Sequence, residues 1–399
     1  MSMPQTLPPD LVEALNTAAG AAVDQSAGTP GAVVGVRTDT GTWLGTFGTA
    51  DPSTGKANTR DTHFRIGSVT KMFTATLLLQ MVESGGLTLA DPIADYVPDV
   101  PGGDQITLDL LARMRSGLAN YTSVPEVAAL IVADPAAPQE PDAMIRLGLS
   151  HSPVFAPDER FDYCNTNYLL LGRVIEQVAD SDFGSLLSEH ILKPLGLTGT
   201  WWPGDSAELP HPFARGFTLL VPSGTPGEPV DATDFNPSWG GAAGSLVSTA
   251  DDLLAFSSIL ATGNGLLGAG TQALVSYGRG LTQLDGWIGH SGDIPGYRAA
   301  CYYHPDISTS VVVLTASDIV AGRCPEASAA VTMASDAECM SPTARIFDAV
   351  SKVLGRPSSG PTGGASGVGR GLKESWRALW VAVSLQRAGR GRLPIGAAR

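Results

Sequence analysis

A serine and a lysine three residues apart, Ser68 and Lys71, stand at the start of an apolar run over residues 72–82. The run is rich in Leu, Met, Ala and Thr and is followed by Gly85 and Gly86, which predicts a buried helix that ends at the glycines. Residues three apart on a helix lie on one face, so the lysine amine can reach the serine hydroxyl. Such a pair predicts nucleophilic catalysis, provided that burial or a positive neighbour lowers the lysine pKa.

The spacing alone is weak evidence for catalysis. Ser53 and Lys56 have the same spacing, but they lie in a turn rich in Pro and Gly with no helix behind it. A helix cap and a surface charge would explain Ser68 and Lys71 equally well. Two further motifs favour the catalytic interpretation.

Tyr163 and Asn165 form the second motif, after a loop over residues 155–162 and just before a helical pattern over residues 168–178. A phenol can pass a proton between nucleophile and leaving group once a lysine ammonium stabilises its anion. A nearby amide can hold the lysine or the substrate. The alternative is a half-buried loop tyrosine beside a turn asparagine.

His290, Ser291 and Gly292 form the third motif, on a predicted strand. The glycine allows a substrate to approach the backbone, and the histidine can polarise the tyrosine. A lone histidine on a strand is otherwise structural. Each of the last two motifs occurs once in the chain, which favours a common function for the three.

The predicted strands lie at the two ends of the chain and the predicted helices lie between them. This order favours an α+β fold, with one antiparallel sheet built from both ends and a mostly helical domain inserted, so that a cleft forms where they meet. Strands are expected at residues 32–36, 43–47, 287–290, 297–303 and 309–316, and helices at 183–192, 250–260 and 342–354, the last capped by Ser341.

Three parts of the chain follow from this pattern. We expect residues 8–70 and 275–356 to form one discontinuous sheet domain and residues 71–274 to form the helical domain. Residues 357–399 are expected to form a glycine-rich linker and a basic tail.

The three motifs, in this chain order, resemble those of the serine β-lactamase and DD-peptidase superfamily, specifically the branch of class C β-lactamases and Streptomyces-type D-alanyl-D-alanine carboxypeptidases. The resemblance extends from about Leu11 to Leu354. It includes residues 115–118 followed by Tyr121, and residues 248–253. It does not cover the basic tail.

The resemblance implies a β-lactamase/transpeptidase-like fold and an acyl-enzyme mechanism without a cofactor. Ser68 would be the nucleophile, Lys71 its base or proton partner, and Tyr163 the general base and acid. The remaining roles implied are a positioning amide (Asn165), a replacement for the usual lysine of the third motif (His290), oxyanion-binding backbone N–H groups (Ser68, Asp293) and a lining of the substrate cleft (Trp239, Ser291, Gly292).

Two departures from the carboxypeptidase pattern concern the substrate. Those enzymes hold the terminal carboxylate of the substrate with hydroxyls beside the third motif and with an arginine soon after a Tyr-Gly-x-Gly-Leu segment. Here Thr282 follows that segment, Arg279 occupies its variable slot, and Asp293 replaces a hydroxyl. A carboxylate ~4 Å from that of a substrate would repel it by several kcal/mol at an effective dielectric near 20.

Three functions therefore stay open. The resemblance indicates a carboxypeptidase or β-lactamase-like enzyme with a small-molecule or peptide substrate, and the local charge argument favours an esterase acting on neutral acyl donors. A binding protein that keeps the fold without catalysis is the third.

Composition excludes some partners. With 43% hydrophobic residues and a formal net charge of −14, the chain can build a large core but is a poor ligand for nucleic acid. No apolar run approaches the ~20 residues of a membrane span. Residues 373–399 are basic, with tryptophans at 376 and 380, so membrane-surface contact and an unfolded extension both stay open for this tail. We expect a monomer.

The four cysteines give two expectations. Cys324 and Cys339 flank a loop of small residues and predict a disulfide, whereas Cys164 and Cys301 predict buried free thiols. A disulfide favours an extracytoplasmic protein whose leader is missing, but the N-terminus shows no signal peptide and would fit the cytoplasm. No metal site is expected, because no Cys-x-x-Cys or His pair at metal spacing occurs.

Overall fold

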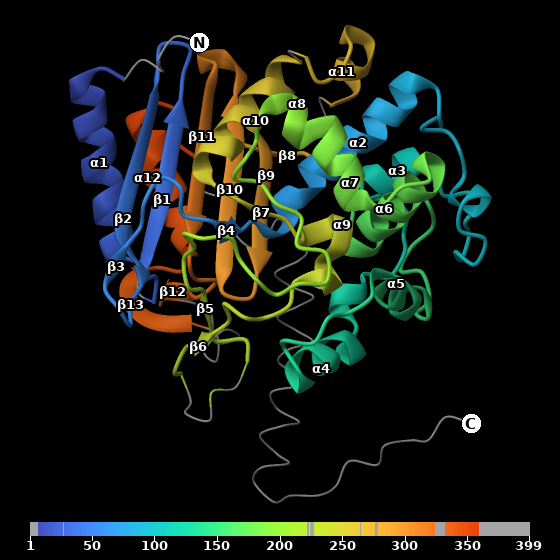
Figure 1. The fold of residues 1–399 in the computed structure, drawn as a ribbon, viewed down its shortest axis with the longest axis horizontal. Helices are drawn as coiled ribbons and strands as arrows, with labels where there is room; N and C mark the ends of the chain where they lie inside the picture. Colours follow the sequence, from blue (N-terminus) through green and yellow to red (C-terminus); the bar gives the residue numbers. More distant parts are fainter. Residues whose placement is uncertain are drawn as a thin grey trace, which may run out of the picture.

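A seven-stranded antiparallel sheet dominates the computed structural model, which describes residues 7–26, 28–221, 223, 227–263, 265–275, 278–323 and 332–358. Its strand order is β3-β2-β1-β11-β10-β9-β8. Three strands come from the N-terminal part of the chain and four from the C-terminal part, as the sequence predicts (Figure 1). Their bounds are β1 Gly31–Arg37, β2 Thr42–Asp51, β3 Lys56–Ala57, β8 Thr282–Leu284, β9 Trp287–Ile294, β10 Tyr297–His304 and β11 Thr309–Thr315.

Helices cover both faces of this sheet, and most of them lie in the chain between its N-terminal and C-terminal strands. Helices α1 and α12 pack together on one face, and α10 packs on the other face against β1, β10 and β11. The helices are α1 Pro9–Asp24, α2 Thr70–Ser84, α3 Leu108–Ala112, α4 Pro125–Ala133, α5 Pro141–Leu149, α6 Asn165–Ala179, α7 Phe183–Leu187, α8 Lys193–Leu195, α9 Gly241–Gly244, α10 Ala250–Thr262, α11 Ala269–Val275 and α12 Pro342–Val353.

Short strands and tight helical turns complete the fold. The short strands pair two by two: β4 Phe64–Arg65 with β7 Val247–Ser248, β5 Phe217–Thr218 with β6 Val230–Asp231, and β12 Val320–Arg323 with β13 Thr332–Glu338. The turns are η1 Gly67–Val69, η2 Ile93–Asp95, η3 Tyr121–Ser123, η5 Ser238–Gly240 and η6 Pro305–Ile307, and η4 Ser188–Leu192 is a π-helical turn.

The central strands β1 and β11 are buried on both faces because helices cover the sheet on each side. Successive side chains of a strand point to opposite faces, so each strand supplies two cores. Val33 and Leu314 belong to the core beneath the helical region, whereas Val34 and Val313 belong to the core beneath α1 and α12. Val33 pairs with Leu314 and Val34 pairs with Val313. The register of β1 and β11 therefore places side chains of the same core opposite each other.

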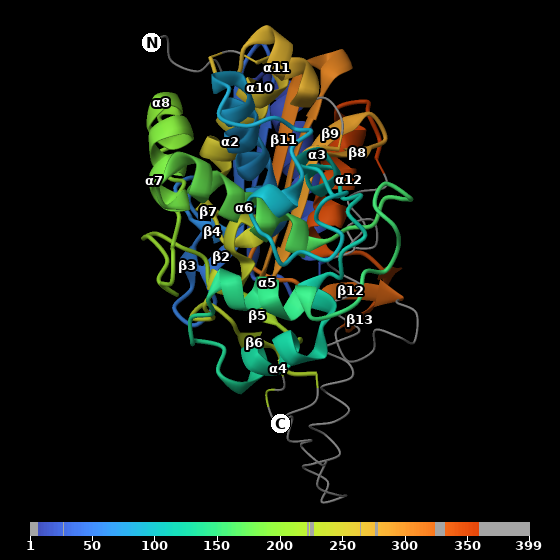
Figure 2. The same cartoon turned by 90° about the vertical axis from the view of Figure 1, so that its right-hand side faces the viewer.

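Helix α2 runs through the middle of the helical region, where it contacts α6, α9 and α11. Figure 2, which views the molecule from the helical side, shows α2 and α6 near its centre. Every residue of α2 from Thr70 to Leu79 is buried, which explains an apolar run without a polar face. The helix ends at Gly85, whose φ of 77° is the left-handed conformation of a glycine cap.

Most of the predicted elements are present, with shifted ends. The terminal helix begins after Ser341, whose side chain accepts a hydrogen bond from the backbone N–H of Ala344. The helix expected at 183–192 is instead split into α7 and the π-helical turn η4. Helix α1 was not expected from the sequence. The division into a sheet domain and a helical domain stays a prediction, and residues 359–399 of the tail lie outside the described residues.

Among the helices of the described residues, none combines the length and apolar character that a membrane span requires.

Leu314→Ala tests the role of the central strand. Leu314 is fully buried on β11, so the variant should lower the free energy of unfolding by about 2–5 kcal/mol. Leu130→Ala, on α4 with 42% of its side chain exposed, is the matched control and should change it by no more than about 0.5 kcal/mol. Urea denaturation measures both, and equal effects would contradict this placement of the core.

Candidate active site

Ser68 and Lys71 lie at the start of α2, where the turn η1 leads into the helix. Ser68 is 4% exposed and Lys71 is fully buried. The Nζ atom of Lys71 lies 3.0 Å from the Oγ atom of Ser68, so the helical spacing brings the two groups into contact as predicted. The free N–H groups at a helix start also carry partial positive charge, which opposes a second positive charge on Lys71.

Two further acceptors surround the Lys71 amine. Its Nζ atom lies 2.8 Å from the side-chain oxygen of Asn165 and 2.6 Å from the backbone oxygen of Ala243. A neutral amine has two hydrogens and one lone pair, so it can donate to these two oxygens and accept the hydrogen of the Ser68 hydroxyl. Burial holds the pKa of Lys71 well below its ordinary value of 10.5, which favours this neutral form.

The amide of Asn165 is oriented by two residues that the sequence motifs did not indicate. Its Nδ2 atom donates to Thr122 at 3.0 Å, and its backbone N–H donates to Asn120 at 3.0 Å. Thr122 in turn donates to Asn120 at 3.0 Å. These bonds leave the Asn165 oxygen facing Lys71. The polar run near Tyr121 was the sequence signal for them, whereas the backbone oxygen of Ala243 has none.

Tyr163 lies beside this pair, with its ring centroid 5.0 Å from Lys71 Nζ. The side chain is 4% exposed, and its hydroxyl forms no hydrogen bond of normal distance and angle with any described residue. Burial raises the pKa of Tyr163 well above its ordinary value of 10, although the nearby hydroxyl of Ser68 opposes the rise. Tyr163 therefore holds its proton and has a free hydroxyl for an atom of a substrate.

His290 lies on β9 with its ring centroid 6.0 Å from that of Tyr163. Burial lowers the pKa of His290 to about 3, so the imidazole is neutral at physiological pH. Its Nδ1 atom lies 2.5 Å from the backbone oxygen of Ser291, which can only accept a hydrogen bond. The hydrogen is thus on Nδ1, and Nε2 is left as an acceptor.

The backbones of η1 and β9 approach each other so closely that both need glycine. A Cβ atom on Gly292 would lie 1.8 Å from the backbone oxygen of Ile66 and 3.2 Å from the backbone nitrogen of Ser68. Gly67 has a φ of 49°, and a Cβ there would lie 2.6 Å from the backbone nitrogen of Asp293. The backbone N–H groups of Ser68 and Asp293 are therefore close to each other, and two such donors can bind an oxyanion.

The side chain of Asp293 is paired. Its Oδ2 atom lies 2.8 Å from the Nη2 atom of Arg298, which is 4% exposed. Asp293 itself is 19% exposed. The charge of the Asp293 carboxylate, which we expected to repel a substrate carboxylate, is thus partly neutralised by Arg298.

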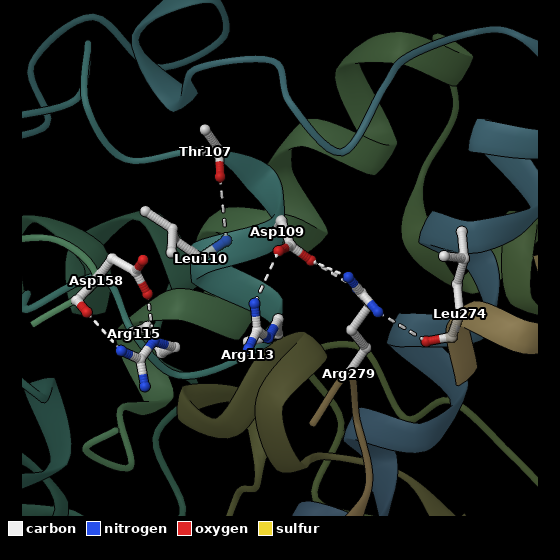
Figure 3. A network of polar contacts seen from close by, with 8 residues as sticks. All are labelled: Thr107, Asp109, Leu110, Arg113, Arg115, Asp158, Leu274 and Arg279. Atoms are coloured by element: carbon white, nitrogen blue, oxygen red, sulfur yellow. Dashed lines mark hydrogen bonds and ion pairs between the residues drawn. The ribbon is translucent and has the colours of Figure 1, made fainter. Parts of the chain in front are cut away.

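Arg279 is held by Asp109 and by the backbone of Leu274 (Figure 3). Its guanidinium contacts Asp109 Oδ1, with Nη2 at 2.5 Å, and donates to the backbone oxygen of Leu274 at 3.0 Å. Arg113 holds the other oxygen of Asp109 at 3.3 Å. This network holds the loop before β8 in place. The guanidinium of Arg279 points toward Asp109.

The remaining predicted site residues have mixed outcomes. Trp239 is 6% exposed in the core, with its backbone oxygen bound to the hydroxyl of Tyr121 at 2.8 Å, so its role in lining the cleft stays a prediction. Cys339 is disulfide-bonded, but Cys324 lies outside the described residues and the pairing stays a prediction. Cys164 and Cys301 are buried free thiols. No cluster of His, Cys, Asp or Glu within the described ranges could hold a metal ion.

A cavity of about 390 Å³ lies between α2, α10 and α11 and the strands β9 and β10. Its walls include Met72, Leu260, Ile288 and Tyr303, and none of the candidate catalytic side chains lines it. We therefore place the site by its polar geometry rather than by the size of a cavity.

A family model for the β-lactamases matches residues 16–327. The chain belongs to the β-lactamase family. It accordingly has a β-lactamase/transpeptidase-like fold.

Among the relatives of this β-lactamase family member is penicillin-binding protein 4 of Amycolatopsis lactamdurans, 30% identical over 57% of this chain and 58% of that protein. A D-aminopeptidase of Brucella anthropi is 30% identical over 67% of this chain and 52% of that protein. The chain thus spans only a little over half the length of these two curated relatives.

Solved structures cover the chain more fully. A D-stereospecific amidohydrolase from Streptomyces sp. has a TM-score of 0.70 and 30% identity, over 77% of this chain and 94% of that one. The D-amino acid amidase of Ochrobactrum anthropi SV3, in complex with L-phenylalanine amide, has a TM-score of 0.71 and 25% identity, over 86% of this chain and 100% of that one.

Gly292→Ala tests the close approach of β9 and η1. The new Cβ would overlap the backbone oxygen of Ile66, so the two N–H groups would separate. Loss of one oxyanion donor typically costs about 10²–10³ in rate, and labelling of Ser68 by a fluorophosphonate should slow by at least about that factor. Ser291→Ala, one residue away without a steric clash, should slow it far less. Equal rates for Gly292→Ala and the native protein would contradict the geometry.

Proposed function

We propose that this chain hydrolyses amide bonds on the carbonyl side of D-amino acid residues, through an acyl-enzyme on Ser68. The observation that carries the proposal is the buried contact of Lys71 Nζ with Ser68 Oγ, with the oxygens of Asn165 and Ala243 as further acceptors around the amine. The substrate class is supported by similarity to a D-stereospecific amidohydrolase, a D-amino acid amidase and a D-aminopeptidase.

In the first step, the Lys71 amine takes the proton of the Ser68 hydroxyl as the oxygen attacks the substrate carbonyl carbon. The negative charge that develops on the carbonyl oxygen is stabilised by the backbone N–H groups of Ser68 and Asp293. These dipoles are already in place, so no reorganisation is needed when the charge forms.

In the second step, the C–N bond breaks and the departing amine needs a proton. The Tyr163 hydroxyl is protonated and lies beside Lys71, so it can donate this proton, and the Lys71 ammonium can return one to it. His290 is neutral with a pKa of about 3, so it does not compete for this proton. Water then hydrolyses the ester on Ser68 by the reverse sequence.

A protonated Tyr163 favours amides over esters as substrates. An amine leaves as a neutral molecule only when it receives a proton, whereas an alkoxide from an activated ester leaves more readily without one. The relatives compared above also favour the amide, and the esterase alternative loses support.

Carboxypeptidase or β-lactamase activity is the second candidate, since a relative is a penicillin-binding protein. Both substrates carry a carboxylate. Arg279 is held by Asp109, and Arg298 is buried and paired with Asp293, so neither is an unengaged cation for that carboxylate. We therefore place D-amino acid amides first. The monomeric state and the cellular compartment stay predictions.

Enantiomeric p-nitroanilides test the proposal. D-Alanine p-nitroanilide should be hydrolysed with a kcat/KM at least about tenfold above that of the L-enantiomer, nitrocefin and a D-alanyl-D-alanine peptide, a difference of about 1.4 kcal/mol. Intact-mass spectrometry should detect the acyl-enzyme.

Ser68→Ala should remove about 10⁴-fold or more of the rate. Ser53→Ala is the matched control, because Ser53 and Lys56 repeat the spacing in an exposed turn, and it should keep full activity. Preference for the L-enantiomer, or rapid cleavage of p-nitrophenyl butyrate with no cleavage of either anilide, would contradict the proposal.

A further inference from the structure

Thr122, in the turn η3, contacts one end of the Asn165 side-chain amide, and Lys71 contacts the other end. The Nδ2 atom of Asn165 lies 3.0 Å from Thr122 Oγ1, and its Oδ1 atom lies 2.8 Å from Lys71 Nζ. Thr122 is 1% exposed and Asn165 is 4% exposed, so water has little access to either contact. The two ends of an amide are not equivalent, because the oxygen accepts hydrogen bonds and the NH2 group donates them.

The direction of the hydrogen bonds at Thr122 is set by the backbone. The backbone N–H of Asn165 can only donate, and its partner at 3.0 Å is a side-chain atom of Asn120. That atom must therefore be the amide oxygen of Asn120, an acceptor. The Thr122 hydroxyl lies 3.0 Å from the same oxygen, so its single hydrogen points to Asn120. The hydroxyl then offers only lone pairs to Asn165.

The Asn165 amide satisfies this hydroxyl in one orientation only. With its NH2 group toward Thr122, the amide donates a hydrogen bond there, and its oxygen faces Lys71. In the flipped orientation, two oxygens would face each other at Thr122 with no hydrogen between them. A buried contact of this kind is unfavourable, because neither oxygen can turn to water instead.

The orientation of the amide matters because Lys71 needs its lone pair. A neutral amine has one lone pair, and Lys71 uses it to take the proton of Ser68. An amide oxygen beside the amine accepts one of its hydrogens and leaves the lone pair free. An NH2 group in the same place would donate to the lone pair, in competition with the Ser68 hydroxyl.

We propose that Thr122 is a positioning residue for the formation of the acyl-enzyme. Its hydroxyl, directed by Asn120, holds the Asn165 amide in the one orientation that leaves the lone pair of Lys71 for the nucleophile. Because Thr122 is 1% exposed, it acts through Asn165 and not by contact with the substrate. This inference rests on the acyl-enzyme of the proposed function, but not on the choice of D-amino acid amides as substrates.

The rate at which a fluorophosphonate labels Ser68 measures the activation of the nucleophile without any amide substrate. Thr122→Val replaces the hydroxyl by a methyl group of nearly the same size. The variant should lower the labelling rate by about tenfold or more, the usual loss when a buried hydrogen-bonding group is left without its partner. The kcat for D-alanine p-nitroanilide should fall in parallel, because the same step is affected.

Three further variants separate the hydroxyl from the shape of the side chain. Thr122→Ser keeps the hydroxyl and should restore most of the labelling rate. Asn120→Ala removes the acceptor that directs the hydroxyl and should slow labelling as Thr122→Val does, which keeps the test open if one variant does not fold. Thr76→Val is the matched control, because Thr76 is also 1% exposed but donates to the backbone oxygen of Met72 within α2, at 2.8 Å. It should be labelled at the native rate.

The pH dependence of labelling distinguishes a turned amide from a loosened site. An oxygen beside the amine favours its charged form, so loss of that oxygen should lower the pKa of Lys71 further and move the half-maximal rate to lower pH. A loosened site would admit water, which would move the pKa of Lys71 back toward 10.5 and the half-maximal rate to higher pH. The other titratable groups around the amine are unchanged in the variant: Tyr163, Cys164, Tyr168 and His290.

The outcomes separate the two claims. If the native protein cleaves the D-anilide but Thr122→Val is labelled at the native rate, the inference is overturned and the proposed function stands. Equal slowing of Thr122→Val and Thr122→Ser, or a shift of the half-maximal rate to higher pH, would overturn it as well. If the native protein is labelled at Ser68 but cleaves no D-amino acid amide, the proposed substrate fails, while slowing in Thr122→Val and Asn120→Ala alone still supports the inference.

Discussion

A lysine amine removed from water must have its hydrogens and its lone pair satisfied by fixed partners, and this requirement at Lys71 governs the site. The partners come from separate segments: Ser68 from η1, Asn165 from α6 and Ala243 from α9. Each must lie within hydrogen-bonding distance of the amine, at 2.6–3.0 Å, while the amine still faces the serine. The packing of α2 against α6 and α9 therefore determines the chemistry as well as the stability of the helical region.

The sheet satisfies the second geometric requirement, the approach of β9 to η1. Strand β9 is held by β10, and β10 by the central strand β11, whose seven residues are all buried. A strand supported in this way cannot move away from the helix start without disrupting the core. Gly292 and Gly67 then allow contact between backbones at a distance that no side chain would permit.

The sequence predicted those parts of the fold and site that depend on local patterns. The helical spacing of Ser68 and Lys71 was enough to predict their contact, and the strands at both ends of the chain were enough to predict one antiparallel sheet. The partners of Lys71 could be predicted only in part. Asn165 lies in a motif, but Ala243 contributes a backbone oxygen, and a backbone oxygen has no residue type that a sequence could reveal.

Charge pairs over long sequence separations were equally hidden. Arg279 pairs with Asp109, 170 residues earlier, so its direction could not be deduced from the segment around it. Arg298 is only five residues from Asp293, yet their contact depends on the two-residue turn of the β9–β10 hairpin, which sets them opposite each other. The effect of Asp293 on a substrate carboxylate stays a prediction, and its partner Arg298 was not foreseen from the sequence.

The ionisation state of Lys71 is the central claim, and carbon-13 NMR of lysine labelled at Cε measures it directly. A titration of the native protein, with Lys71→Met to assign the resonance, follows the Cε shift as pH rises. Because the folded pKa is lowered, the amine should lose its proton as the pH passes a value well below 10.5, and should be neutral above it. A Lys71 resonance that titrates at or above 10.5 would show that the amine stays charged at working pH, and would contradict its role as the base for Ser68.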